Sequence, residues 1–163
     1  MVRCQKGVAG TREHDLYNLR MGSSGRILAI DYGSRRMGLA VSDALGITAQ
    51  GLETMQRRNR RADLKYLERL IREYEVKEIV LGYPLKMSGD QGPQSEKVAE
   101  FGAVLRQQFG LPVQLWDERL TSAEANRVLR EAELSIEKRA RAVDRMAAVL
   151  ILQSFLQARG ASN

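Results

Sequence analysis

Residues 26–41 read RILAIDYGSRRMGLAV, and this stretch decides the fold. Residues 27–30 form a short apolar run, Gly33 lies in the polar segment that follows, and residues 38–41 resume the apolar run. Two apolar runs separated by a turn segment are typical of a pair of antiparallel strands. The stretch therefore predicts strand, turn and strand, with Asp31 directly after the first strand.

The rest of the chain alternates between strand-like and helix-like apolar spacing. The pattern predicts strands over residues 47–55, 78–81 and 113–116, and helices over residues 62–75, 93–109, 121–131 and 140–158. A meander of three strands followed by strands in βα units predicts an α/β fold. We expect a mixed five-stranded sheet, three antiparallel plus two parallel strands, flanked by helices.

The length of 163 residues is typical of one domain, which we place over residues 26–158. Residues 1–25 show no apolar periodicity and end in Gly-Ser-Ser-Gly, so they are predicted to be a flexible leader. Residues 159–163 are predicted to be a tail.

The composition favours a polyanionic partner. Lys and Arg outnumber Asp and Glu by 26 to 20, which gives a formal charge of +6. Many cations fall in a first basic cluster (Arg57, Arg58, Arg60, Arg61) and a second basic cluster (Lys138, Arg139, Arg141, Arg145). We expect both clusters to widen a phosphate-binding surface, although solvated charge is the commoner fate of such runs.

No apolar run approaches the roughly 20 residues that span a bilayer. The single cysteine excludes an internal disulfide and fits a reducing compartment. We therefore expect a cytoplasmic protein that binds nucleic acid, has no membrane contact and is a monomer or homodimer.

Three acids are candidate metal ligands. Asp31 follows the first predicted strand, Glu118 follows the last, and Asp144 lies in the long C-terminal helix. Ligands of such sheets gather beyond the carboxyl ends of the strands, so Asp31 and Glu118 can share a metal if their strands are neighbours. Carboxylates without histidine or cysteine suit Mg²⁺, with Mn²⁺ as a substitute. Each acid taken singly could equally be a helix cap or turn residue.

Several short motifs carry a resemblance to a known family. They are DYGSRRMG at 31–38, GYP at 82–84, GP at 92–93, DERLT at 117–121, and VD at 143–144 with AA at 147–148 and ILQ at 151–153. In this order they resemble the YqgF (RuvX) family, from about Arg26 to Leu156. That family is similar to the Holliday junction resolvase RuvC and to ribonuclease H. The resemblance implies a ribonuclease H-like nuclease that matures the 5′ end of pre-16S ribosomal RNA.

By this resemblance, Asp31, Glu118 and Asp144 form the catalytic, metal-holding triad. Cations near the triad are predicted to contact nucleic acid, and these are Arg35, Arg36, Lys86 and Arg119. Arg119 could equally be the ion-pair partner of Glu118. Tyr83 stands where the family usually has Leu or Phe, and Lys86 where it usually has Asn, which bears on how the 82–92 loop contacts substrate.

Other functions fit parts of the same pattern. A Holliday junction resolvase would use the same triad on four-way DNA, as a two-fold dimer. A binding module without catalysis would bind nucleic acid but show no cleavage stimulated by Mg²⁺. Asp31-x-Gly33 followed by Gly38 also resembles the first phosphate loop of the actin and sugar-kinase folds, but such an ATPase needs a second domain for which this chain has no room.

Overall fold

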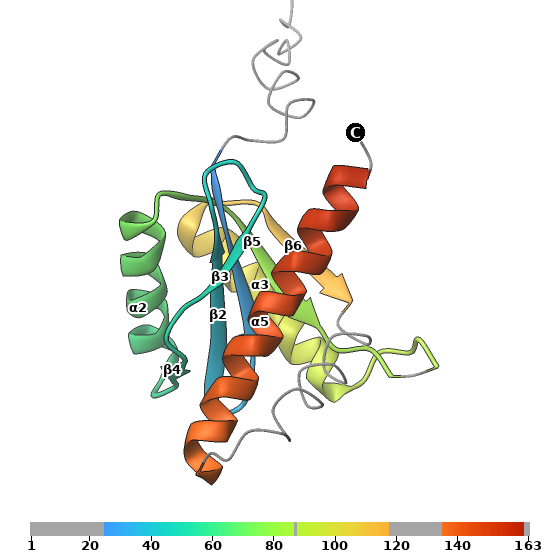
Figure 1. Cartoon of the computed structure of the whole chain (residues 1–163). Helices are drawn as coiled ribbons and strands as arrows, with labels where there is room; N and C mark the ends of the chain where they lie inside the picture. The colour runs from blue at the N-terminus through green and yellow to red at the C-terminus, as the bar shows by residue number, and fades with distance from the viewer. Residues whose placement is uncertain (1–24, 87, 118–134, 162–163) are drawn as a thin grey trace, which may run out of the picture.

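A computed structural model describes residues 25–86, 88–117 and 135–161 (Figure 1). The elements are β1 (Arg26–Tyr32), β2 (Arg36–Ser42), β3 (Ala49–Gly51), β4 (Met55–Gln56), α2 (Arg60–Glu73), β5 (Val76–Tyr83), α3 (Pro93–Phe109), β6 (Val113–Asp117) and α5 (Ile136–Ala161). The predictions for the leader, for the helix over 121–131, and for Glu118 and Arg119 fall outside the described residues.

The strands form one mixed sheet, as predicted. Its order is β3-β2-β1-β5-β6, and the short β4 also pairs with β2. β1 pairs with β2 antiparallel and with β5 parallel, and β5 pairs with β6 parallel. The carboxyl ends of β1, β5 and β6 therefore meet at one edge of the sheet, which is the edge where ligands of such folds gather.

The predicted third strand, residues 47–55, is instead two short strands. Ala40 pairs with Gly51 and Met37 pairs with Met55, so the two residues of β2 between these pairs face three residues of the opposing chain. This one-residue excess is the count of a β-bulge, which interrupts pairing and bends the strand. The pattern of residues 47–55 predicted one strand because spacing along one segment does not show where its pairing with another segment is interrupted.

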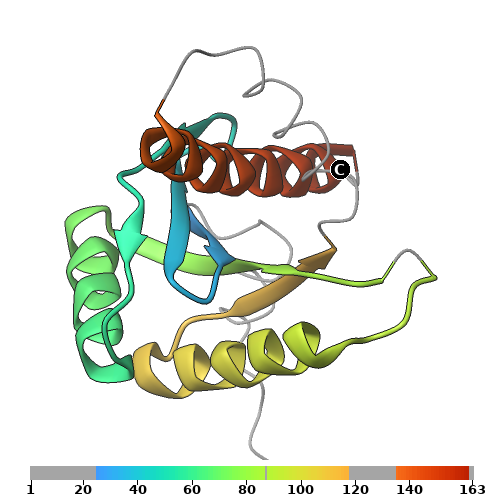
Figure 2. The ribbon, with the colours of Figure 1, turned by 90° about the horizontal axis from the view of Figure 1, so that it is seen from below.

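The two faces of the sheet are covered by different helices. Side chains alternate along β1: Ile27 and Ala29 belong to the core cluster beneath α5, whereas Leu28 and Ile30 belong to the cluster that includes residues of α2 and α3. Figure 2 shows the resulting layers, with α5 on one side of the strands and α2 and α3 on the other. A residue on β1 that is odd-numbered therefore faces α5.

Helix ends are set by local chemistry that the apolar pattern only partly records. α2 begins two residues earlier than predicted, because Asn59 Oδ1 accepts a hydrogen bond from the backbone N of Ala62 at 2.9 Å and caps the helix. α3 runs from Pro93 to Phe109 as predicted, and Gly110 ends it with φ 63°.

α5 spans Ile136–Ala161 rather than 140–158. Its first turn is exposed, with Ile136 89% accessible, and an exposed turn carries no apolar spacing by which the sequence could reveal it. Within the described residues, no helix is both long and apolar enough to cross a membrane.

Candidate active site

Asp31 lies near the carboxyl end of β1 and faces α5. It follows Ile27 and Ala29 on the same face of the strand, and its antiparallel partner on β2 is Gly38. Two acids meet at this point, because α5 carries Asp144 across the same two strands.

Gly38 allows α5 to lie directly on the sheet. A Cβ atom added at Gly38 would collide with the backbone carbonyl oxygen of Asp144. The small residues Ala40 and Ala148 continue the same contact, and both are fully buried. Small residues on both the strands and α5 therefore let the helix lie close to the sheet, and at Gly38 the contact leaves room for glycine alone.

The structure brings Asp31 and Asp144 together. Burial of Asp31, and secondarily the negative charge of Asp144, raise the pKa of the Asp31 carboxyl from 3.8 to about 6. A half-buried acid beside a second carboxylate is costly when both are ionised, unless a cation neutralises them. The two side chains thus provide carboxylate oxygens and excess negative charge at one place. A divalent metal ion such as Mg²⁺ binds such oxygens and would neutralise that charge.

Arg36 supplies part of that positive charge. Its Nε donates a hydrogen bond to Oδ2 of Asp144 at 2.7 Å, and both side chains are less than one-third exposed. Among the described residues no hydrogen bond uses the two Nη atoms of Arg36, so they remain able to contact a phosphate. Arg36, which is predicted to contact nucleic acid, is therefore also the ion-pair partner of Asp144, a predicted metal ligand.

Arg35 lies in the turn between β1 and β2. Its side chain is exposed, and its backbone oxygen accepts a hydrogen bond from the N of Arg57 at 2.9 Å. The turn itself is closed by a bond from the N of Gly33 to the oxygen of Arg36 at 3.0 Å. Of the two neighbouring arginines, Arg36 is therefore the one that the structure ties to an acid of the candidate site.

Arg57 is a framework residue that sequence reasoning placed among surface cations. Its guanidinium bonds the oxygen of Gly33 at 2.9 Å, pairs with Asp63 at 3.2 Å and lies 4.4 Å from the ring centre of Tyr32. Asp63 is buried and also accepts from the backbone N of Arg58 at 3.1 Å. One signal was available: Asp63 lies in the first turn of α2, six residues after Arg57.

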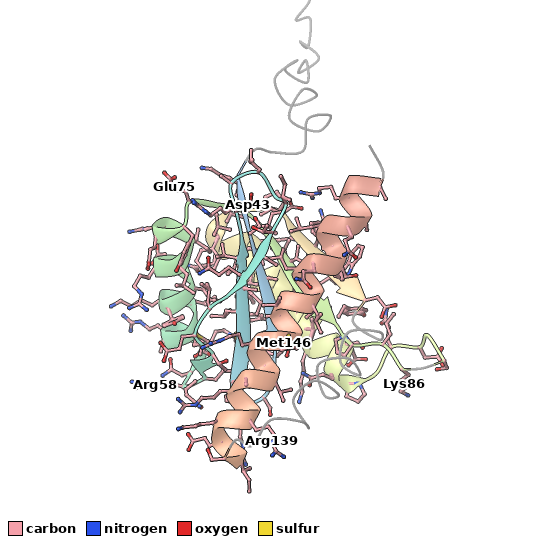
Figure 3. All side chains as sticks on the ribbon, viewed as in Figure 1. Asp43, Arg58, Glu75, Lys86, Arg139 and Met146 are labelled. Carbon is pink, nitrogen blue, oxygen red and sulfur yellow. The ribbon has the colours of Figure 1, made fainter. Side chains whose placement is uncertain are left out.

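Gln94 is a further residue near the site that the sequence did not reveal. Its Nε2 donates to the backbone oxygen of Tyr32 at 3.3 Å and ties the first turn of α3 to the end of β1. Lys86 precedes this helix in an exposed loop, where its backbone bonds Asp90 and Gly89. Its side chain lies beside Gly92, and none of its described contacts is with Asp31 or Asp144. Figure 3 shows Lys86 in this loop, away from Arg139 at the start of α5.

The condition under which Asp31 and Glu118 would share a metal is not met as stated. β5 lies between β1 and β6, so the two strands are not neighbours. They do run parallel to β5 and end at the same edge, and Glu118 directly follows the last residue of β6 in the sequence. Within the described residues there is no group of three acids, histidines or cysteines that could hold a metal ion.

Comparison with known proteins places this geometry among nucleases. A family model described as "RuvX: Holliday junction resolvase" matches residues 25–158. A protein of Koribacter versatilis named as a candidate pre-16S rRNA nuclease is 61% identical over 136 residues, which are 83% of this chain and 89% of that protein. A protein of Clostridium acetobutylicum with the same name is 50% identical over 131 residues, covering 80% of this chain and 97% of that protein.

Solved structures of resolvases share the fold. Thermus thermophilus RuvC in complex with a Holliday junction substrate has a TM-score of 0.51 at 18% identity, covering 85% of this chain and 97% of that one. The fowlpox virus resolvase in complex with Holliday junction DNA has a TM-score of 0.54 at 12% identity, covering 82% and 98%. These likenesses confirm the predicted ribonuclease H-like sheet.

Proposed function

Because the chain belongs to the RuvX family of nucleases, we propose that it hydrolyses phosphodiester bonds in the 5′-end processing of pre-16S ribosomal RNA. The choice of substrate is supported by relatives with 61% and 50% identity whose names refer to pre-16S rRNA. The resolvase structures are below 20% identity and support the fold alone.

The proposed catalytic and metal-holding residues are Asp31, Asp144 and Glu118. The observation that carries the proposal is the placement of Asp31 beside Asp144 at the carboxyl edge of the sheet, with the pKa of Asp31 raised by burial and by Asp144. Divalent metal chemistry is supported by this donor set, and we propose Mg²⁺ with Mn²⁺ as a substitute. When bound, such ions supply Lewis acidity and an activated water for attack on phosphorus.

The residues of the chain then have distinct tasks. Asp31 and Asp144 would supply carboxylate oxygens from β1 and α5, and Gly38 permits the close approach of that helix to the strands. Arg36 holds the Asp144 carboxylate through Nε and offers its Nη atoms to the scissile phosphate, whose charge grows in the transition state. Arg35, Lys86 and Arg119 are proposed to contact the nucleic-acid backbone further out.

Branched DNA is the second candidate substrate, because the matching family model carries the resolvase description. The metals act on the phosphate rather than the sugar, so the acids would serve both substrates. A resolvase would further require two sites related by two-fold symmetry.

The test compares Mg²⁺-dependent cleavage of labelled pre-16S rRNA and of a labelled four-way junction. The enzyme forms are wild type, Asp31→Asn, Glu118→Gln and the control Glu75→Gln. Glu75 is exposed and lies at the opposite end of the molecule from Arg139 (Figure 3). Cleavage of the rRNA that is lost in the first two variants and kept in the control supports the proposal. Cleavage of the junction alone replaces the substrate, and binding of both without cleavage leaves a non-catalytic module.

A further inference from the structure

The two basic clusters of the sequence converge in space. Thr54 Oγ1 donates to the backbone oxygen of Arg141 at 2.8 Å, and Nε of Arg145 donates to the backbone oxygen of Leu52 at 2.9 Å. These bonds fasten the bulge between β3 and β4 to the first half of α5. Figure 3 shows the result, with Arg58 of the first cluster and Arg139 of the second at the same end of the molecule.

A hollow lies where the clusters meet, between β4, α2 and α5. Its volume of about 370 Å³ is within the range of roughly 300–1,000 Å³ that ligand pockets occupy. The lining includes Arg58, Arg69 and Arg141, together with Glu53, Thr54 and Tyr66. We refer to this hollow as the basic groove.

The charge of the basic groove is positive once internal pairs are set aside. Asp63 also lines it, but this buried acid is neutralised by Arg57, so it does not oppose an anion. Arg58 is exposed, and its side chain makes no hydrogen bond or ion pair among the described residues. With the pairs Arg57–Asp63 and Arg141–Glu137 set aside, Arg58 and Arg69 remain against the single carboxylate of Glu53.

Arg69 and Arg141 are positioned but still available. Arg69 lies over the ring of Tyr66, with 4.8 Å from its guanidinium carbon to the ring centre, which orients the side chain. No carboxylate in the described part of the chain forms an ion pair with it. Arg141 pairs with Glu137 at 2.9 Å, but both side chains are nearly half exposed or more, and such a pair exchanges readily for a phosphate.

The basic groove adjoins the candidate active site. Gln56 lines the groove and is the strand partner of Arg36, which holds Asp144. On α5, Arg141 precedes Asp144 by three residues, which is less than one helical turn. A nucleic-acid strand leaving the two aspartates past Arg36 would therefore enter the groove next.

We propose that the basic groove binds the phosphate backbone of the substrate strand that flanks the scissile phosphate, through Arg58, Arg69 and Arg141. The inference rests on the proposed nuclease function and adds the path of its substrate. An extended polyanion fits better than a small one, because the three guanidiniums come from separate parts of the fold, the connection between β4 and α2, α2 itself and α5.

The test measures binding of a single-stranded RNA, without divalent metal, as a function of salt concentration. Each phosphate contact on a single strand contributes about 0.7 to the slope of log K against log salt. The double variant Arg58→Gln/Arg69→Gln should lower that slope by about 1.4. The control Lys65→Gln/Arg72→Gln removes the same charge from exposed positions of α2 that do not line the groove, and should leave the slope near the wild-type value.

Two further arms keep the outcomes distinct. Arg58→Lys/Arg69→Lys should restore most of the slope, because the charge is retained. If the slope is the same in the double variant and in the control, the groove does not bind the RNA backbone. The second arm adds a free mononucleotide: if it binds to the groove but leaves the salt slope of RNA binding unchanged, the proposal is also wrong. Because the binding arm needs no cleavage, an inactive wild type would contradict the proposed function without deciding the groove.

Discussion

Arg36 and Asp144 are joined by a 2.7 Å hydrogen bond from Nε to Oδ2, although 108 positions separate them in the sequence. The bond fastens β2 to α5 at the point where the two aspartates meet. It also gives the acidic pair a cation that belongs to the chain itself, and this cation competes with any metal ion for the same oxygen.

Arg36→Met should therefore move metal affinity and stability in opposite directions. Without metal, loss of a partly buried ion pair should lower the free energy of unfolding by about 1 kcal/mol. Binding of Mn²⁺ should become tighter, because Asp144 no longer has an internal partner, while kcat should fall through loss of the phosphate contact. Calorimetric titration and denaturation with and without Mn²⁺ measure both effects.

The matched control is Arg159→Met, which breaks the 2.8 Å pair between Arg159 and Glu78 elsewhere on α5. It should destabilise the protein without changing metal affinity. Weaker Mn²⁺ binding in Arg36→Met would contradict the competition between the guanidinium and the metal.

The raised pKa of Asp31 predicts a specific dependence of stability on pH. The folded state holds the Asp31 proton up to about pH 6, whereas the unfolded chain releases it near 3.8, so the metal-free protein should lose stability as pH rises between these values. The loss should reach at most about 3 kcal/mol, at 1.36 kcal/mol per unit of pKa. Asp31→Asn should remove this loss, as measured by denaturant unfolding from pH 4 to pH 8.

Asp43 offers a control of opposite sign. Hydrogen bonds from the backbone N–H groups of Thr48 and Ile47 lower the pKa of its carboxyl, so its contribution is present at neutral pH and lost in acid. Asp43→Asn should therefore destabilise the protein most above pH 4. If Asp31→Asn behaves like Asp43→Asn, the raised pKa of Asp31 is refuted.

Gly38→Ala should damage both stability and activity. The added methyl group would collide with the backbone of Asp144, and backbone yields less readily than a side chain, so we expect a loss of about 1–3 kcal/mol. α5 would lift where Asp144 faces Asp31, which should lower kcat further than the loss of stability explains. Thermal melting and single-turnover cleavage measure the two effects.

Gly102→Ala is the contrasting substitution. There the new Cβ would lie 3.4 Å from methyl groups of Leu81 and Leu115 and 3.8 Å from one of Val113, which are side-chain contacts, and alanine favours the helix that contains it. Its melting temperature should stay within a few degrees of wild type. An equal loss in both variants would mean that the contact at Gly38 is not specifically tight.

Arg57 and Arg58 should separate structure from binding within the first basic cluster. Arg57→Gln leaves the buried Asp63 without its cation and should cost about 2 kcal/mol of stability, with little change in the salt slope of RNA binding. Arg58→Gln should do the reverse. A shared phenotype in denaturation and salt-titration experiments would contradict this division.

The sequence revealed the sheet and its acids because both follow local rules. Asp31 directly follows a short apolar run that, with the turn and the second run after it, predicted a strand, and Asp144 lies in the apolar pattern that predicted the long C-terminal helix. Strand and helix periods were sufficient for those assignments, whereas the close contact between α5 and the sheet is known only from the structure.

The remaining features depend on which distant residues and strands pair with one another, and the spacing of residues along the chain does not predict that. The ion pair of Arg36 joins residues far apart in the chain, and the bulge before β4 adds one residue to a strand without altering its composition. The position of β5 between β1 and β6 is likewise a property of sheet order rather than of any strand. For the same reason the sequence predicts Arg57 as part of a surface cluster, whereas in the structure its guanidinium is held by Asp63 and Gly33.

Asp31 lies in the first strand and Asp144 in the last described helix, and Gly38 brings them into one site. The two acids can therefore meet only after the ribosome has made and released residues 31–144. A shorter nascent chain would lack the proposed catalytic pair, so cleavage of RNA would have to wait until β1, β2 and α5 have folded together.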